Sequence, residues 1–207
     1  MIFVAQQPEP DDFDENVRQP GQQFLFANPN PTSKEFAAHA YWREAAGALR
    51  SAYGEICAYT CHWISPDTGW QTVEHFVPKS VDPQRAYDWS NYRLVCGRLN
   101  GRKGDHQDIL DPFVIAGVMF VLDFPSMLVK PRQDLPQPDK EAVLQTISRL
   151  KLNDDDTCVA ARLNYVVDYC EGDISLDFLR RHAPFIFREL ERQELRDRLR
   201  QVMGMAS

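Results

Sequence analysis

Along most of the chain after residue 31, hydrophobic residues recur at intervals that favour regular secondary structure. Thr32 and Glu35 have the spacing of a capping box, and the apolar residues that follow them indicate an amphipathic helix. Two short runs of apolar and aromatic residues further on are typical of strands. The predicted elements are, in order, a helix over 34–53, strands over 70–76 and 89–95, a helix over 98–107, a hairpin with strands over 118–124 and 127–130, and helices over 139–151, 156–171, 175–182 and 184–202.

These elements predict an α+β fold with three regions. Residues 1–31 are rich in Pro, Gln, Asn and Asp, so we expect an extended N-terminal arm there. Its apolar cluster, Phe24-Leu25-Phe26, is expected to dock on the protein's own core. Residues 32–112 contain the first helix, the two strands and the helix after them, and residues 113–207 contain the hairpin and a helical C-terminal region.

The charge of the chain is unevenly distributed. A net charge of −7 on 207 residues argues against a protein that binds nucleic acid by bulk electrostatic attraction alone. Between His75 and His106, however, six basic residues stand against three acidic ones, which gives a local charge of +3. We interpret this stretch as a basic site on an acidic body, where a partner supplies part of the grip on nucleic acid. A scattered, solvated surface is the alternative.

The chain contains no feature that predicts contact with a membrane. No run of 18 apolar residues is present, and the first residues lack the basic and apolar segments of a signal peptide. The five cysteines are an odd number, which we interpret as reduced thiols. We therefore expect a cytoplasmic protein without a membrane partner.

Four polar residues carry the candidate chemistry: Glu74, His75, Asn91 and Asn100. A carboxylate, an imidazole and amide oxygens brought together suit the metal-assisted cleavage of a phosphodiester. An imidazole whose pKa lies near neutrality can take a proton from a water molecule that attacks phosphorus. Because neighbours in a strand point to opposite faces, Glu74 and His75 can share one site only if the strand ends or bulges there.

The motifs around these residues resemble those of the HNH (ββα-metal) endonucleases. The three motifs are E-H-F-x-P-K-S at residue 74, W-x-N-x-x-L-x-C at residue 89 and N-x-x-K-G-D at residue 100. Within that family they are similar to the HNH subunit of Septu-type anti-phage systems, and the resemblance covers roughly residues 55–165. It implies a ββα-metal core embedded in a mainly helical domain.

The resemblance also implies a role for each site residue. His75 would be the general base, and Glu74 and Asn100 would bind Mg²⁺ or Mn²⁺ through oxygen. Asn91 would clasp the intervening loop through backbone hydrogen bonds and so orient His75. Arg102 and Lys103 would contact phosphates of the nucleic acid, with a solvated surface as the alternative.

Cysteine pairs in related proteins bind a structural zinc ion, but here the pairs are incomplete. Cys57 and Cys61 are separated by three residues, and Leu99 stands where the mate of Cys96 would be. Zinc requires four thiolate or imidazole ligands. We favour buried thiols that pack as small hydrophobic side chains, and structural Zn²⁺ is the alternative.

The resulting hypothesis is a metal-dependent HNH endonuclease that acts in bacterial anti-phage defence with an ATPase subunit. Because the sequence contains no G-x-x-x-x-G-K-[ST] motif, ATP would be bound by another chain. We expect a nucleic-acid substrate and favour DNA over RNA. Two alternatives stay open: a stand-alone HNH nuclease of repair or mobile-element type, and a non-catalytic ββα module that binds nucleic acid.

Overall fold

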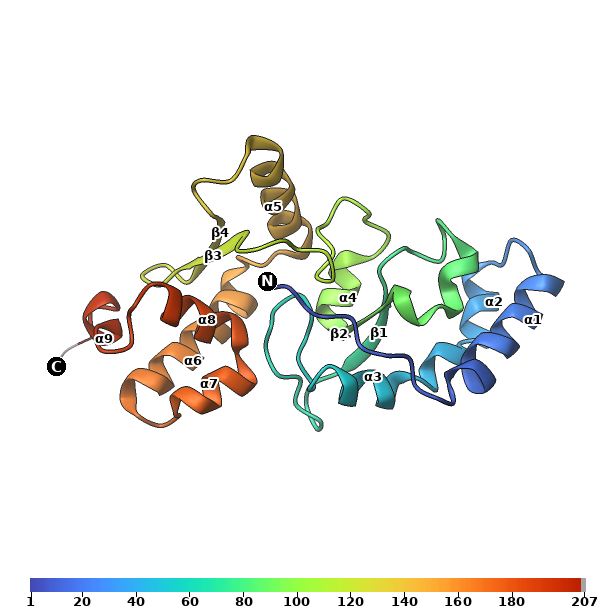
Figure 1. The fold of residues 1–207 in the computed structure, drawn as a ribbon, viewed down its shortest axis with the longest axis horizontal. Coiled ribbons are helices and arrows are strands. Elements are labelled where there is room, and N and C mark those ends of the chain that lie inside the picture. Colours follow the sequence, from blue (N-terminus) through green and yellow to red (C-terminus); the bar gives the residue numbers. More distant parts are fainter. Residues whose placement is uncertain (206–207) are drawn as a thin grey trace. The chain divides into compact units, whose positions relative to one another are not determined.

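The computed structural model describes residues 1–205, without the side chain of residue 155. The chain divides into two compact units (Figure 1). The first, here the β1–β2 unit, consists of Ala5–Cys57 and Ile64–Gln107. The second, the β3–β4 unit, consists of Met1–Val4, Ala58–Trp63 and the chain from Asp108 onward. The units contain helices and two small antiparallel sheets, which confirms the predicted α+β class.

Two antiparallel strands and a helix form the centre of the β1–β2 unit. The strands are β1 (Gln71–His75) and β2 (Tyr92–Cys96), and α4 (Gly97–Lys103) follows β2 directly. Gln71 lies opposite Cys96 and His75 lies opposite Tyr92. The predicted order of strand, strand and helix is therefore confirmed, although the helix ends four residues earlier than the predicted 107.

The prediction of an extended arm over residues 1–31 is wrong for its second half. Residues 14–27 form a π-helical turn (Asp14–Arg18) and α1 (Gln19–Ala27). Phe24 and Leu25 are buried, as expected for docking on the protein's own core, whereas Phe26 is 91% exposed. Gly21 lies directly against the Tyr87 ring, where an added Cβ would come within 2.1 Å of a ring carbon. Packing against the core thus orders this polar segment.

The predicted helix over 34–53 is divided into two. The capping box starts α2 (Ser33–Ala38): the Glu35 amide donates to Thr32 Oγ1 at 3.3 Å, and the Glu35 carboxylate accepts from the Thr32 amide at 2.7 Å. A 3₁₀ turn (Tyr41–Arg43) separates it from α3 (Ala46–Ala52). His39 leaves the helical conformation because tertiary contacts hold it: its ring stacks on Phe24 at 4.0 Å, and its carbonyl accepts a hydrogen bond from the Tyr87 hydroxyl at 2.8 Å.

The β3–β4 unit combines a hairpin with helices. Strands β3 (Phe120–Asp123) and β4 (Leu128–Pro131) pair antiparallel, as predicted. The predicted helix over 184–202 is broken after Arg192, where Glu194 has a φ of 54° that a continuous helix excludes. The helices of this unit are α5 (Gln137–Leu150), α6 (Ala160–Glu171), which continues a π-helical turn (Asp155–Val159), α7 (Leu176–His182), α8 (Pro184–Arg192) and α9 (Leu199–Val202).

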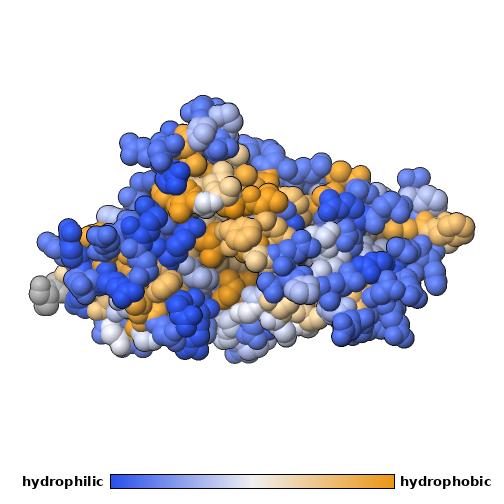
Figure 2. Space-filling view, viewed as in Figure 1, coloured by the Kyte–Doolittle hydropathy of each residue, from blue (hydrophilic) through white to orange (hydrophobic). Residues whose placement is uncertain are grey.

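The face of the molecule in Figure 2 is largely hydrophilic, with hydrophobic patches between the hydrophilic side chains. Phe26 and Trp70 are the most exposed large apolar side chains of the β1–β2 unit among the described residues. Over residues 1–205, every helix is too short or too polar to cross a lipid bilayer.

Candidate active site

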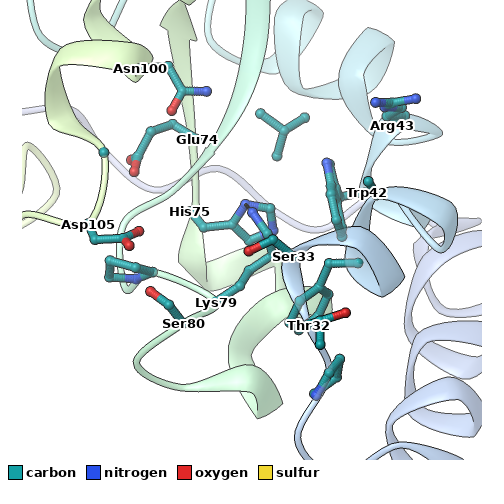
Figure 3. A pocket seen from close by; sticks show the side chains of 16 residues that line it. Thr32, Ser33, Trp42, Arg43, Glu74, His75, Lys79, Ser80, Asn100 and Asp105 are labelled. Carbon is teal, nitrogen blue, oxygen red and sulfur yellow. Dashed lines mark hydrogen bonds between the residues drawn. The ribbon is translucent and has the colours of Figure 1, made fainter.

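A cavity of about 640 Å³ opens in the β1–β2 unit at the end of β1. Glu74, His75 and Asn100 all line it, so three of the predicted site residues meet in one place (Figure 3). Glu74 and His75 are neighbours in β1, and neighbours within a strand point to opposite faces. Because β1 ends at His75, both side chains can reach the same cavity. The other polar and charged side chains of the lining are Thr32, Ser33, Arg43, Lys79, Ser80 and Asp105, and its aromatic side chains are Phe36 and Trp42.

His75 is held in a single tautomer by a backbone carbonyl. Its Nε2 lies 2.9 Å from the Ala86 carbonyl oxygen, and because a carbonyl can only accept, Nε2 carries the hydrogen. The second nitrogen, Nδ1, therefore presents a lone pair. The pKa of His75 is lowered from 6.5 to about 3. Burial of the ring is the main cause, and the nearby positive charge of Lys79 is the second. The imidazole is therefore neutral at pH 7 with an acceptor position at Nδ1, but in this structure it is a weaker base than the near-neutral imidazole expected from the sequence.

Asn91 makes the backbone contacts predicted for a loop clasp. Its Oδ1 accepts from the Val77 amide at 2.8 Å, and its Nδ2 donates to the carbonyls of Val77 and Arg85 at 3.0 Å each. Its own carbonyl accepts from the Phe76 amide at 2.9 Å. Arg85 directly precedes Ala86, whose carbonyl holds the imidazole. Asn91 thus holds the loop that carries this carbonyl, and its side chain is fully buried.

Glu74 is paired with a lysine inside the protein. Lys103 Nζ lies 2.7 Å from Glu74 Oε1, and both side chains are 2% exposed or less. The same ammonium donates to the carbonyls of His75 at 2.8 Å and Phe76 at 2.7 Å. Three acceptors therefore surround the three hydrogens of Lys103, which neutralises the buried carboxylate and ties α4 to the end of β1.

This pairing corrects the prediction that Lys103 contacts phosphate. The side chain is fully buried and occupied by Glu74 and two carbonyls, so it does not present a charge to a ligand in this structure. Arg93, another of the six basic residues of the stretch, is also buried, at 3% exposure. Arg102 is half-buried, does not line the cavity, and its predicted phosphate contact stays a prediction.

The orientation of the Asn100 amide follows from its neighbour. Thr72 Oγ1 donates to the Val95 carbonyl at 2.8 Å, so its hydroxyl hydrogen is used there. Asn100 Nδ2 lies 2.9 Å from the same Oγ1 and must be the donor, which turns Oδ1 the other way. In Figure 3 this oxygen lies on the side of the Glu74 carboxylate.

The donor set fits a hard divalent cation. A carboxylate has several lone pairs and can accept from Lys103 while it also ligates an ion. Glu74 and Asn100 both line the cavity with oxygen atoms that can act as ligands. Mg²⁺ commonly uses one or two protein oxygens and completes its shell with water and phosphate. Among the described residues, no group of three or more His, Cys, Asp and Glu side chains converges as a metal site. The set of Glu74 and Asn100 offers the ion two protein oxygens, and the Glu74 carboxylate is already paired with Lys103. We therefore expect weak metal binding in the absence of substrate.

The cysteines are only partly brought together. Cys57 and Cys96 lie in the same unit with their sulfur atoms 4.0 Å apart. Cys61 belongs to the other unit, where its sulfur lies 3.9 Å from the Ala58 carbonyl oxygen. The preference for packed thiols over zinc stays a prediction.

Three residues of the cavity were missed by the sequence analysis. Lys79 follows His75 by four residues, and its Nζ lies 3.2 Å from His75 Nδ1. Trp42 contacts the His75 ring edge-on at a centroid distance of 4.9 Å, and Asp105 faces the cavity from the end of α4. The K-S and K-G-D letters of the motifs could have drawn attention to Lys79 and Asp105, whereas no sequence pattern connects Trp42 to the site.

Comparison with known proteins relates part of the chain to a Septu protein. No protein-family model matches the sequence. The chain is 31% identical over 67 residues to Septu protein PtuB of Bacillus thuringiensis. The match covers 32% of this chain and 26% of that protein, so the chain spans about a quarter of its relative's length.

Proposed function

We propose that the β1–β2 unit is an HNH nuclease core and that its cavity hydrolyses phosphodiester bonds of nucleic acid, DNA in preference to RNA. The observation that carries the proposal is the convergence of Glu74, His75 and Asn100 on one cavity. The succession of β1, β2 and α4 supports it, because this is the order of elements that the ββα resemblance implies.

His75 acts as the general base in this proposal. Nδ1 accepts a proton from water while the water oxygen attacks phosphorus. The Ala86 carbonyl keeps the ring in place, and its bond to Nε2–H strengthens when the ring becomes positive. Asn91 holds the loop that carries this carbonyl, so the geometry of the base does not depend on substrate.

Glu74 and Asn100 would hold Mg²⁺ or Mn²⁺. When bound, such an ion stabilises the negative charge that grows on the leaving oxygen. Lys103 keeps the Glu74 carboxylate fixed at the cavity wall, and Thr72 keeps the Asn100 amide oriented. Both ligands are therefore preorganised by their own hydrogen bonds.

We further propose a role in anti-phage defence, together with an ATPase partner. The similarity to a Septu protein supports the defence role. The net charge of −7 supports a partner that shares the binding of nucleic acid, because a chain of net negative charge is not drawn to nucleic acid by bulk electrostatic attraction.

The test uses the purified chain alone and in complex with the products of neighbouring genes, on labelled DNA and on tRNA. We expect cleavage with Mg²⁺, loss of cleavage in EDTA and strong loss in the Glu74→Gln variant. Efficient cutting by the chain alone would favour a stand-alone nuclease. Binding of nucleic acid without cleavage in any complex would favour the non-catalytic module and contradict the proposal.

A further inference from the structure

Lys79 occupies the lone pair that the proposed base needs. Its Nζ lies 3.2 Å from His75 Nδ1, the one ring nitrogen that carries no hydrogen. The same Nζ lies 4.7 Å from the centroid of the Trp42 ring, and the side chain lines the cavity (Figure 3). In this structure an ammonium group therefore caps the base.

The acceptors around Lys79 are weak ones for an ammonium ion. A neutral imidazole nitrogen and an aromatic face contact it directly. Among residues 1–205 no carboxylate lies within ion-pair distance of its Nζ, and Glu74 and Asp105 attract it only from further away. Lys103 is the opposite case, since a carboxylate and two carbonyls saturate it. Of the two lysines beside His75, Lys79 is the half-buried one, and among the described residues no carboxylate is in direct contact with it.

A phosphate group would compete well for this ammonium. Hydrogen bonds from lysine to a charged oxygen are shorter and stronger than those to a neutral acceptor. The Lys79 side chain has a flexible four-carbon stem, so its Nζ can move by a few ångströms while the Trp42 face still attracts it.

We propose that Lys79 is the phosphate-binding residue of this cavity and that phosphate binding draws its ammonium group off His75 Nδ1. This inference rests on the proposed function for the identity of the phosphate, which would belong to the nucleic-acid backbone. Substrate then performs two tasks at once, because it neutralises Lys79 and frees the base beside the bound phosphate.

The binding step can be tested without cleavage and without metal. The full chain, with ¹⁵N-labelled histidine and in EDTA, is titrated with inorganic phosphate while the His75 Nδ1 signal is followed by long-range ¹H–¹⁵N correlation. We expect the signal to move with added phosphate in the wild type. In Lys79→Met the affinity for phosphate should fall by about tenfold or more, the effect of losing one charge-assisted hydrogen bond. Lys79→Arg should retain most of it.

Lys34→Met is the matched control, since Lys34 is an exposed lysine of the same unit outside the cavity lining. It should bind phosphate like the wild type. Circular dichroism spectra that coincide for all variants establish that they are folded. Equal phosphate affinity in Lys79→Met and wild type, or a His75 Nδ1 signal that ignores phosphate, would overturn the inference. Phosphate binding through Lys79 in a protein that cuts no nucleic acid would support the inference while the proposed function fails.

Discussion

The buried pair of Glu74 and Lys103 gives the sharpest prediction for stability. Replacement of Lys103 by methionine keeps most of the side-chain volume but removes the ammonium that lies 2.7 Å from Glu74 Oε1. The carboxylate is then left unpaired at 2% exposure or less, and two carbonyls lose a donor. Removal of one partner of such a pair costs about 3–5 kcal/mol of unfolding free energy.

Urea denaturation followed by tryptophan fluorescence measures this cost for four proteins: wild type, Lys103→Met, Glu74→Gln and the double variant. The double variant removes the stranded charge, so it should be more stable than Lys103→Met by roughly 1–3 kcal/mol. Arg98→Met, an exposed position on the same helix, is the control and should change stability by less than about 0.5 kcal/mol. A Lys103→Met variant as stable as Arg98→Met would refute the buried ion pair.

Three further predictions concern the loop held by Asn91, the N-terminal cap of α2 and the dependence of stability on pH. Asn91→Ala removes three hydrogen bonds to loop backbone and should lower both the melting temperature and the cleavage rate; an unchanged rate would show that the clasp does not position the base. Thr32→Ala removes the cap of α2 and should cost about 1 kcal/mol in a denaturation experiment. Burial lowers the pKa of His75 to about 3 from 6.5, so the unfolded chain binds the additional proton first and stability falls as pH drops below 6.5. At pH 5 this term amounts to about 2 kcal/mol, and His75→Gln should show a correspondingly smaller loss between pH 7 and pH 5.

The parts of the site that the sequence predicts are those set by local signals. Short runs of apolar and aromatic residues locate β1 and β2, and the predicted first strand, over 70–76, extends one residue past His75, where β1 ends. The convergence of Glu74 and Asn100 on His75 follows from the same hairpin and from the helix that continues it. The relative positions of these three residues depend on short segments, and the hydrophobic pattern of the sequence largely predicts the secondary structure of those segments.

The errors lie where distant residues decide the structure. Phe13, Val17 and Phe24 have near-helical spacing, but the Pro and polar content of the segment indicated an arm. Tertiary contacts order the helix: Phe13 packs on Trp89, and Gly21 lies against Tyr87. The helix break at His39 likewise depends on tertiary contacts.

Lys103 illustrates the same difficulty at the site itself. In a run of Gly and basic residues a lysine is expected at the surface. The Glu74 carboxylate that pairs with the buried Lys103 lies on β1, distant in sequence from α4. Lys79 was counted only as one of several basic residues, because its contact with His75 Nδ1 depends on how the loop after β1 folds back. Sequence spacing alone therefore could not distinguish Lys103, whose ammonium is bound by three protein acceptors, from Lys79, whose ammonium contacts a neutral nitrogen and an aromatic ring.

The most direct test of the central claim is the first-order rate at which the active form of the protein, alone or in complex, cleaves one labelled DNA with Mg²⁺. The measurement compares wild type with His75→Ala and with His106→Ala, a histidine outside the cavity lining. Loss of a general base should slow His75→Ala by about 10²–10⁴-fold, while His106→Ala should cut at the wild-type rate. Equal rates for wild type and His75→Ala, with both proteins folded, would contradict the account.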